Sequence, residues 1–143
     1  MEKWHDPESG RDVWLATGLD TWPSKLPWSC AGFGLMLLTE HVVDMEALVE
    51  RAAGQGLALA CVWGPASAVL EDQIVELVDT DVVTTSHPYE TVAETLEIFV
   101  SMLPVTAREP ECRAWCILAA TPELAQSARR ALDRRAAQPR PPT

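Results

Sequence analysis

The stretch Leu57-Ala-Leu-Ala-Cys-Val-Trp63 decides how this chain folds. Its seven consecutive apolar residues leave no polar face, which is typical of a strand buried on both sides in a parallel sheet. Gly64-Pro65 then turns the chain, and after it Leu70, Ile74 and Leu77 recur at helical spacing. The stretch therefore predicts a central strand followed by a helix, the repeating unit of an α/β fold.

Three further strand and helix pairs are predicted around this unit. Thr91-x-x-Glu94 predicts a capping box, and Thr121-Pro122 predicts an N-cap with proline at the first helical position. Gly54 predicts a helix end, with Gly56 in the turn that follows. The first predicted strand is 33–38, and its helix has apolar residues at Met45, Leu48 and Ala52. The next is 81–86, followed by a helix with Val92, Leu96, Phe99 and Leu103 on its apolar side. The last is 113–120, followed by a helix with Leu124, Ala128 and Leu132.

Four such units predict a three-layer α/β sandwich with a sheet of about four mainly parallel strands. Our first choice of strand order is flavodoxin-like or Rossmann-like, 2-1-3-4, which makes the strands at 33–38 and 81–86 neighbours. We expect an irregular tryptophan-rich lead-in over residues 1–21, a single α/β domain over 22–136 and a proline-rich tail over 137–143. Residues 13–17 are the candidate for an extra N-terminal edge strand, and residues 105–112 are predicted to form a polar loop.

Four of the six tryptophans lie within the first 28 residues. Rings of this size either cover the core or form a contact surface, and we favour the first interpretation. The four are Trp4, Trp14, Trp22 and Trp28.

The composition of the 143 residues, 48% hydrophobic with a formal charge of −10, predicts an acidic globular protein. No apolar run is long enough to span a membrane, and the first residues do not have the layout of a signal peptide, so we expect a soluble, cytoplasmic protein. The acidic charge argues against a nucleic-acid partner. No Cys-x-x-Cys pair occurs, and we expect Cys30, Cys61, Cys112 and Cys116 to be reduced thiols.

The charge is uneven along the chain. Residues 129–143 hold five arginines and one acid, Asp133, so this segment carries +4 and the remainder −14. The arginines either fold back on the acidic body, reach an acidic partner, or form a solvated last helical turn before a frayed end. We favour the solvated turn.

A ligand site in an open α/β sheet lies beyond the carboxyl ends of the strands, near the point where strand order reverses. The candidate ligand-binding residues there are Glu40, His41, Trp63, Thr85 and His87. For catalysis the candidates are His87, Ser86 and Glu90, since an imidazole, a hydroxyl and a carboxylate are the parts of acid-base or nucleophilic chemistry. The competing interpretation is that Thr85, Ser86 or His87 caps the next helix, and that Trp63 seals the sheet instead of flooring a pocket.

Two kinds of site are not predicted. A metal site would require His41 and His87 to converge with Glu40 or Glu90, and no ligand spacing supports that, so we expect no metal. A phosphate or dinucleotide site usually has a glycine-rich turn after the first strand, and Gly32-Phe33-Gly34 lies before that strand instead. We therefore expect no cofactor.

Several segments together resemble a family of small bacterial α/β domains of unknown function, the DUF7684 type. The resemblance covers roughly residues 22–132 and implies the α/β fold and the bacterial cytosol, but no activity. The chain differs from that family at 66–68, where charged residues tend to occur, and at Ser86, where a tryptophan is common. The segments that carry the resemblance are Leu26-Pro-Trp-Ser-Cys30, Cys61-Val-Trp-Gly-Pro65, Val83-Thr-Thr-Ser-His87 with Glu90, Glu94 and Phe99, and Cys112-Arg-Ala-Trp115.

Three functions remain open. We favour a non-catalytic binding or protein-interaction module, accessory or immunity-like, whose acidic body complements a basic protein. The alternative is a small hydrolase or transferase that acts on a small molecule with His87. The third is self-association as a homodimer, through an edge strand or the tryptophan-rich segment.

Overall fold

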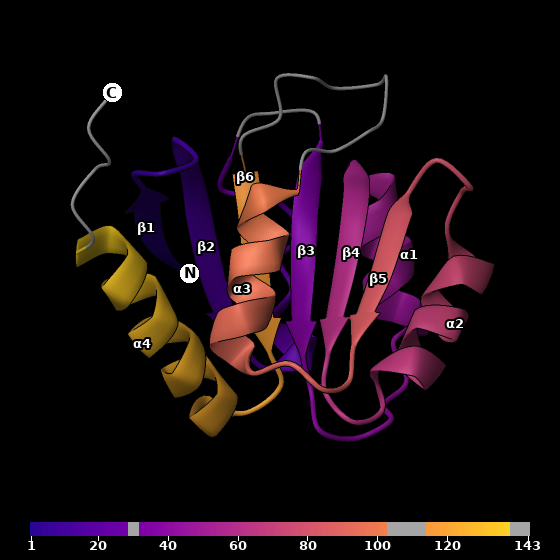
Figure 1. Ribbon diagram of the computed structural model, residues 1–143. Helices are drawn as coiled ribbons and strands as arrows, with labels where there is room; N and C mark the ends of the chain where they lie inside the picture. The colour runs from indigo at the N-terminus through magenta and orange to yellow at the C-terminus, as the bar shows by residue number, and fades with distance from the viewer. Residues whose placement is uncertain (29–31, 103–113, 138–143) are drawn as a thin grey trace.

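The computed structural model describes residues 1–28, 32–102 and 114–137. Within them the chain forms a six-stranded sheet in the order β1-β2-β6-β3-β4-β5 (Figure 1). β1 is antiparallel to β2, and all other neighbouring strands are parallel. The strands are β1 (Glu2–Asp6), β2 (Arg11–Thr17), β3 (Phe33–Leu38), β4 (Leu57–Trp63), β5 (Val83–His87) and β6 (Ala114–Ala119).

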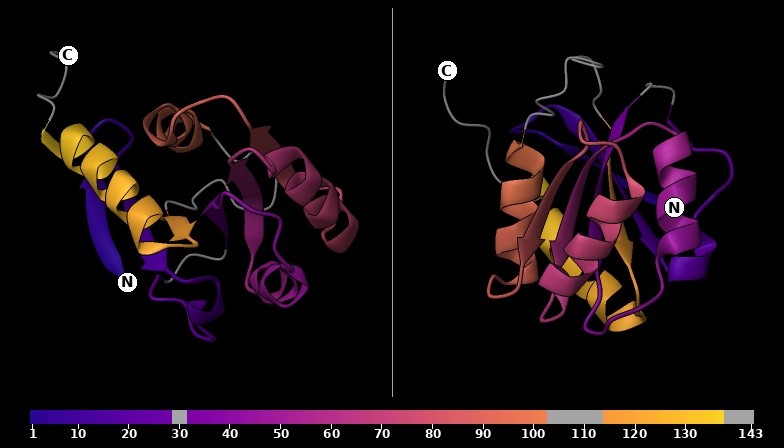
Figure 2. Two further views of the ribbon diagram at one scale, coloured as in Figure 1. Left: turned by 90° about the horizontal axis from the view of Figure 1, so that it is seen from below. Right: turned by 90° about the vertical axis from the view of Figure 1, so that its right-hand side faces the viewer.

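Helices cover both faces of this sheet, so the predicted three-layer α/β sandwich is confirmed, but the sheet has six strands where about four were predicted. α1 (Glu46–Gly54) and α2 (Ser67–Leu77) lie on one face, and α3 (Val92–Ser101) and α4 (Pro122–Ala137) on the other (Figure 2). Each face has its own apolar core, because β3, β4 and β6 bury side chains on both sides. The observed bounds of β3 and β4 agree with the predicted ones.

The predicted helix boundaries are also confirmed. Thr91 accepts a hydrogen bond from the N–H of Glu94, and the Glu94 carboxylate accepts one from the N–H of Thr91, which completes the capping box of α3. Thr121 Oγ1 accepts from the N–H of Leu124 at the start of α4. α1 ends at Gly54, as predicted.

The predicted strand order 2-1-3-4 is wrong. β4 lies between β3 and β5, and β6 takes the other side of β3. The two right-handed crossovers from β3 to β4 and from β4 to β5 run in one direction, which places α1 and α2 on the same face. α3 then crosses on the opposite face and returns the chain to the free side of β3. Strand order therefore reverses between β3 and β6.

The prediction of an irregular lead-in over residues 1–21 is also wrong. β1 and β2 form an antiparallel hairpin, and β2 pairs along its other side with β6. The strand predicted at 13–17 is therefore internal to the sheet, and β1 is the edge strand. A short 3₁₀ helix, η1 (Leu19–Thr21), follows β2.

The tryptophans of the N-terminal region cover the core, as we favoured. Trp22 is 4% exposed, and Trp14 and Trp28 pack against the core on the α1/α2 face. Ring centroids of these residues and Phe33 lie 5.2 to 6.4 Å apart, so the four rings form one cluster. Trp4 lies on the other face, where its Nε1 donates to Asp133 of α4 at 2.8 Å.

The arginines of α4 fold back on the body, so the favoured solvated turn is wrong for two of them. Arg135 pairs with Asp6 at 2.9 Å, and Arg129 pairs with Glu2 at 2.8 Å. Both acids lie on β1, which explains how the last helix covers the edge strand. The proline-rich tail beyond residue 137, the loop at 105–112, Cys30 and Cys112 lie outside the described residues. None of the described helices combines the length and hydropathy that crossing a membrane requires.

Candidate functional site

His87, the last residue of β5, is buried between two polar side chains. Its Nε2 lies 3.0 Å from Oγ1 of Thr85, and its Nδ1 lies 3.6 Å from a carboxylate oxygen of Glu90. Its side chain is 9% exposed. Both ring nitrogens thus face protein groups, which suits an imidazole that holds a loop in place.

Trp63 and Glu90 fix the same loop, which joins β5 to α3. The indole Nε1 of Trp63 donates to the backbone carbonyl of Glu90 at 2.9 Å, and Trp63 packs against the core beneath α3. A hydrogen bond from its own N–H, opposed by partial burial and aided by His87, lowers the pKa of Glu90. Trp63 and His87 therefore lie together because β4 and β5 are neighbours, whereas the predicted order 2-1-3-4 would have placed β3 between these two strands. The helix cap expected from Thr85, Ser86 or His87 is supplied by Thr91 instead.

Ser86 does not join this group. It pairs in register with Val62, which belongs to the core on the α1/α2 face, whereas Thr85 pairs with Cys61 on the opposite face. Because side chains alternate along a strand, Ser86 and His87 point to opposite faces of the sheet. A serine nucleophile activated by this histidine is therefore not formed.

Cys61 lies beneath Thr85 and is fully buried. Burial raises the pKa of its thiol to about 12, although a hydrogen bond with Thr85 acts in the other direction. Burial likewise raises the pKa of the Cys116 thiol. The two cysteines are free thiols, as expected of small buried apolar groups, and neither is a nucleophile at neutral pH.

Glu40 and His41, which follow β3, are separated from the His87 group. The predicted strand order would have made β3 and β5 neighbours, but β4 lies between them, which corresponds to two strand spacings or about 10 Å. Both side chains are exposed, and the carbonyl of His41 accepts a hydrogen bond from Oγ1 of Thr39. The described residues contain no group of three His, Cys, Asp or Glu that could hold a metal ion.

Gly64 explains how the loops after β3 and β4 approach so closely. Its φ is +125°, and a Cβ atom there would lie 2.0 Å from the carbonyl oxygen of Thr39. Its N–H donates to the carbonyl of His87 at 3.2 Å. The Trp-Gly-Pro segment thus allows the ends of β3, β4 and β5 to pack closely together.

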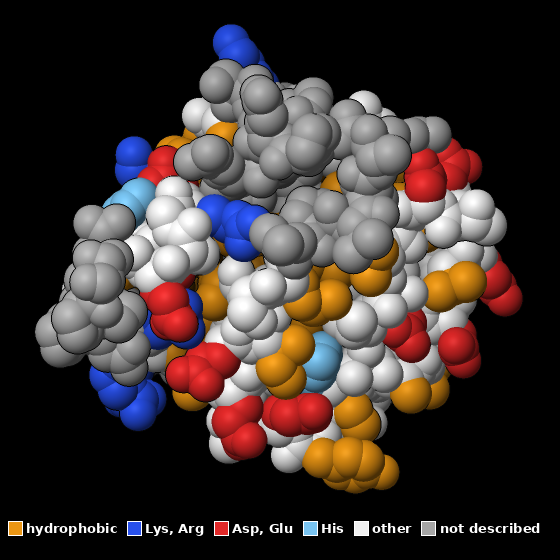
Figure 3. Space-filling model, turned by 45° about the horizontal axis from the view of Figure 1, so that its top comes forward, with side chains coloured by type: hydrophobic (Ala, Val, Ile, Leu, Met, Phe, Trp, Pro, Cys, Tyr) orange, Lys and Arg blue, Asp and Glu red, His pale blue; other side chains and the backbone are white. Residues whose placement is uncertain are grey.

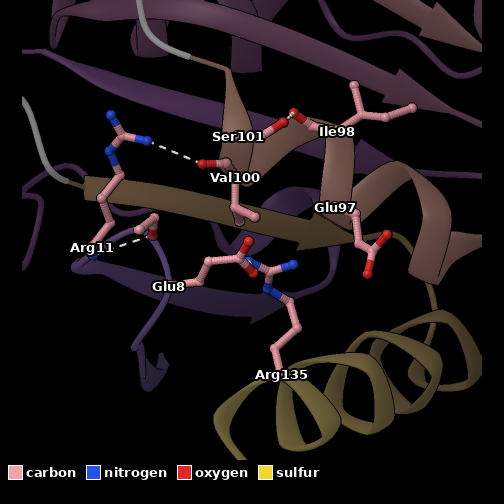
Figure 4. Close-up of a pocket in the computed structure, with 8 residues that line it drawn as sticks. Glu8, Arg11, Glu97, Ile98, Val100, Ser101 and Arg135 are labelled. Atoms are coloured by element: carbon pink, nitrogen blue, oxygen red, sulfur yellow. Dashed lines mark hydrogen bonds and ion pairs between the residues drawn. The ribbon is translucent and has the colours of Figure 1, made fainter. Parts of the chain in front are cut away.

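A cavity of about 650 Å³ lies between the β1–β2 turn, α3 and the end of α4. Figure 4 shows Glu8 and Arg135 pointing toward one another on its floor, with Arg11 on the far side donating to the carbonyl of Val100 at 3.0 Å. Arg11 also stacks over the ring of Trp115, 4.8 Å from its centroid. The guanidinium groups of both arginines are thus held by partners within the protein. The sequence does not indicate this cavity, because its walls come from distant segments.

A second feature missed from the sequence is a groove of about 430 Å³ between α1 and α2. Its walls come from the loop before α1, the first turn of α1 and the last two turns of α2. Three of its lining residues are acidic and none is basic. The lining residues are Val42, Val43, Asp44, Glu46, Gln73, Glu76 and Leu77.

The groove lies in a strongly acidic part of the molecule, residues 40–81, which we call the acidic half. Residues 40–81 contain nine Asp or Glu residues and one basic residue, Arg51, apart from His41. In Figure 3 the Lys and Arg side chains lie on the left half of the view, toward α4, whereas the charged side chains near the right margin are Asp and Glu. The signal in the sequence was the charge of this segment, which a count over the whole chain hides. The nine acids are Glu40, Asp44, Glu46, Glu50, Glu71, Asp72, Glu76, Asp79 and Asp81.

Comparison with known proteins adds no assignment. A scan of protein-family models finds none that matches this chain, and a search of curated proteins finds no similar sequence. The resemblance to a small bacterial α/β family therefore stays a prediction.

Proposed function

We propose that this protein is a non-catalytic interaction module that binds a basic protein through its acidic half. The observation that carries the proposal is the concentration of charge: residues 40–81 have a formal charge of −8, against −10 for the whole chain. A field of one sign speeds association with a partner of the opposite sign and disfavours other partners. An accessory or immunity-like role follows from such binding.

Exposed apolar side chains in the same half support the proposal. Val42, Val69 and Val75 are 55%, 51% and 53% exposed. All three belong to the loop before α1 or to α2, so apolar contacts are available among the carboxylates. Protein interfaces combine apolar contacts of this kind with a polar rim.

The surroundings of His87 favour binding over catalysis. An enzyme using His87 requires a substrate within hydrogen-bond reach of the imidazole. Nε2 of His87 lies at hydrogen-bond distance from Thr85, and a carboxylate oxygen of Glu90 lies 3.6 Å from Nδ1. The loop above the ring is fixed by Trp63 and by the cap of α3. The hydrolase or transferase alternative therefore has less support from the geometry than the binding module has.

The test uses the full chain as bait in an extract of the source cells. We expect one basic protein to be retained in stoichiometric amount and to be released as salt rises toward about 1 M, where charge interactions are screened within about 3 Å. Wild-type bait that retains no such protein, together with a monomeric protein in solution, would argue strongly against the proposal.

Two variants with the same number of neutralised acids provide the control. One changes exposed acids of the acidic half, Glu50→Gln, Asp72→Asn and Glu76→Gln. The other changes exposed acids elsewhere, Asp20→Asn, Glu97→Gln and Glu123→Gln. We expect the first to slow association at least about tenfold and the second to have little effect. If both variants slow association equally, the effect depends on the net charge of the protein and not on the acidic half.

A further inference from the structure

The groove between α1 and α2 is lined by apolar and acidic side chains. Val42 from the loop before α1 and Leu77 from α2 contribute apolar surface, and Val42 is 55% exposed. Asp44 already accepts a hydrogen bond from the N–H of Glu46 at 3.0 Å. The carboxylates of Glu46 and Glu76 are exposed, and none of the ion pairs within the described part of the chain includes either.

The end of α2 makes the negative potential of the groove stronger. The carbonyl groups at a helix C-terminus carry a partial negative charge, which a basic side chain in the last turn usually offsets. The last turn of α2 has no basic residue and contains Glu76 instead. A charge of this sign costs stability in the isolated chain, and such a departure from local preference is characteristic of functional surfaces.

The basic residue nearest in sequence cannot neutralise the groove from within. Arg51 lies in the last turn of α1, and its Nη1 donates to the carbonyl of Trp22 at 3.2 Å. The groove is bordered by the opposite end of α1, the first turn at Glu46. The described residues therefore offer no cation to Glu46 and Glu76.

We propose that this groove docks a basic amphipathic segment of a partner protein, with an arginine side chain laid across it. The aliphatic part of an arginine packs on apolar surface while its guanidinium remains near polar groups, which suits a groove lined by Val42 and Leu77 together with Glu46 and Glu76. Guanidinium and carboxylate groups also form paired hydrogen bonds of fixed geometry. This inference rests on the proposed function and deepens it by giving the partner's chemistry and its place of contact.

The experiment measures binding of a synthetic helical peptide to the ¹⁵N-labelled full chain at low salt. The peptide carries leucine and arginine along one face, and a matched peptide has the uncharged isostere citrulline at each arginine. We expect the arginine peptide to shift the amide signals of residues 42–46 and 73–77, and the citrulline peptide to bind at least about tenfold more weakly. No binding by the arginine peptide, or shifts scattered over the molecule, would overturn the inference.

Variants of the groove complete the test. We expect Glu46→Gln with Glu76→Gln to weaken peptide binding about tenfold or more, and Glu97→Gln with Glu123→Gln to leave it unchanged. All four side chains are exposed, so both variants are expected to fold, which the same spectra check. Equal weakening in the two variants would overturn the inference.

The bait experiment separates this inference from the proposed function. If the Glu46→Gln, Glu76→Gln variant retains the partner as well as wild type does, the partner docks elsewhere, so the groove inference fails while the proposed function stands. If wild type retains no partner, the proposed function fails. A concentration-dependent dimer of the chain that this variant abolishes would assign the groove to the arginines of a second copy and overturn the partner-protein inference.

Discussion

Arg135 of α4 donates two hydrogen bonds to Asp6 of β1, from Nε at 2.9 Å and from Nη2 at 3.1 Å. The two side chains are 11% and 2% exposed, and Asp6 also accepts a hydrogen bond from the N–H of Ser9. A charged pair this deeply buried joins the final helix to the strand at the edge of the sheet. It is a specific contact between segments that begin and end the fold.

Removing the arginine from this pair is expected to destabilise the protein strongly. Arg135→Met leaves the Asp6 carboxylate buried without its cation, and the cost of breaking a buried pair in this way is about 3 kcal/mol. Urea unfolding measures the change. Arg134→Met is the control, because Arg134 is exposed and, within the described part of the chain, donates only to the carbonyl of Arg130, so we expect a change within about 0.5 kcal/mol. If both variants lose the same free energy of unfolding, the Arg135–Asp6 pair does not stabilise the fold more than an exposed arginine does.

The same pair predicts how stability depends on pH. Burial alone would raise the pKa of Asp6, but hydrogen bonds from Arg135 and Ser9 outweigh it and lower the pKa below the ordinary 3.8. A carboxyl with a lower pKa in the folded state stabilises that state above its unfolded pKa, and this contribution is lost as the pH falls through the folded pKa. We expect the difference in urea midpoint between wild type and Asp6→Asn to be constant above about pH 5 and to narrow below about pH 4. A constant difference throughout would contradict the assignment.

A side chain at position 64 is expected to disrupt the joined strand ends. Gly64→Ala puts a Cβ atom 2.0 Å from the Thr39 carbonyl oxygen at a φ of +125°, and we expect a loss of at least about 2 kcal/mol. Gly54→Ala is the matched control, since a Cβ atom added at position 54 would have no other atom within 4 Å. We expect this variant to gain about 0.5 kcal/mol in free energy of unfolding. Thermal unfolding of both variants decides the point.

The buried thiols are expected to be unreactive while the protein is folded. With a pKa of about 12, the fraction of Cys61 present as thiolate at pH 8 is about one in 10⁴. In a Cys30→Ser, Cys112→Ser background, we expect Ellman's reagent to titrate no thiol in buffer and both Cys61 and Cys116 in denaturant. Rapid reaction of the folded variant would show that the sheet opens at β4 or β6.

The sequence predicts the units of this fold well and their arrangement poorly. Apolar runs and caps locate β3, β4, α3 and α4 because these signals depend on neighbouring residues. Strand order depends on the edge of the sheet at which each crossover connection adds the next strand. No pattern of neighbouring residues determines that edge. β1 was missed because a half-exposed edge strand alternates too weakly to stand out.

The candidate site was predicted in part for the same reason. Trp63 at the end of β4 does lie with Thr85, His87 and Glu90, but it does so because β4 and β5 are neighbours, which the predicted strand order did not give. Glu40 and His41 do not join them, because β4 separates β3 from β5. The α1/α2 groove could be found only when the spatial arrangement gathered acids that are dispersed along the chain.

The pairing of β2 with β6 has a consequence for how the protein is made. About a hundred residues separate these two strands, and every residue between them leaves the ribosome before β6 does. Until then the β1–β2 hairpin has one strand edge without its partner, and such edges are prone to pair with other chains. The sheet is therefore completed only when β6 has been made, and until then the edge of β2 that β6 will cover is open to pairing with another chain.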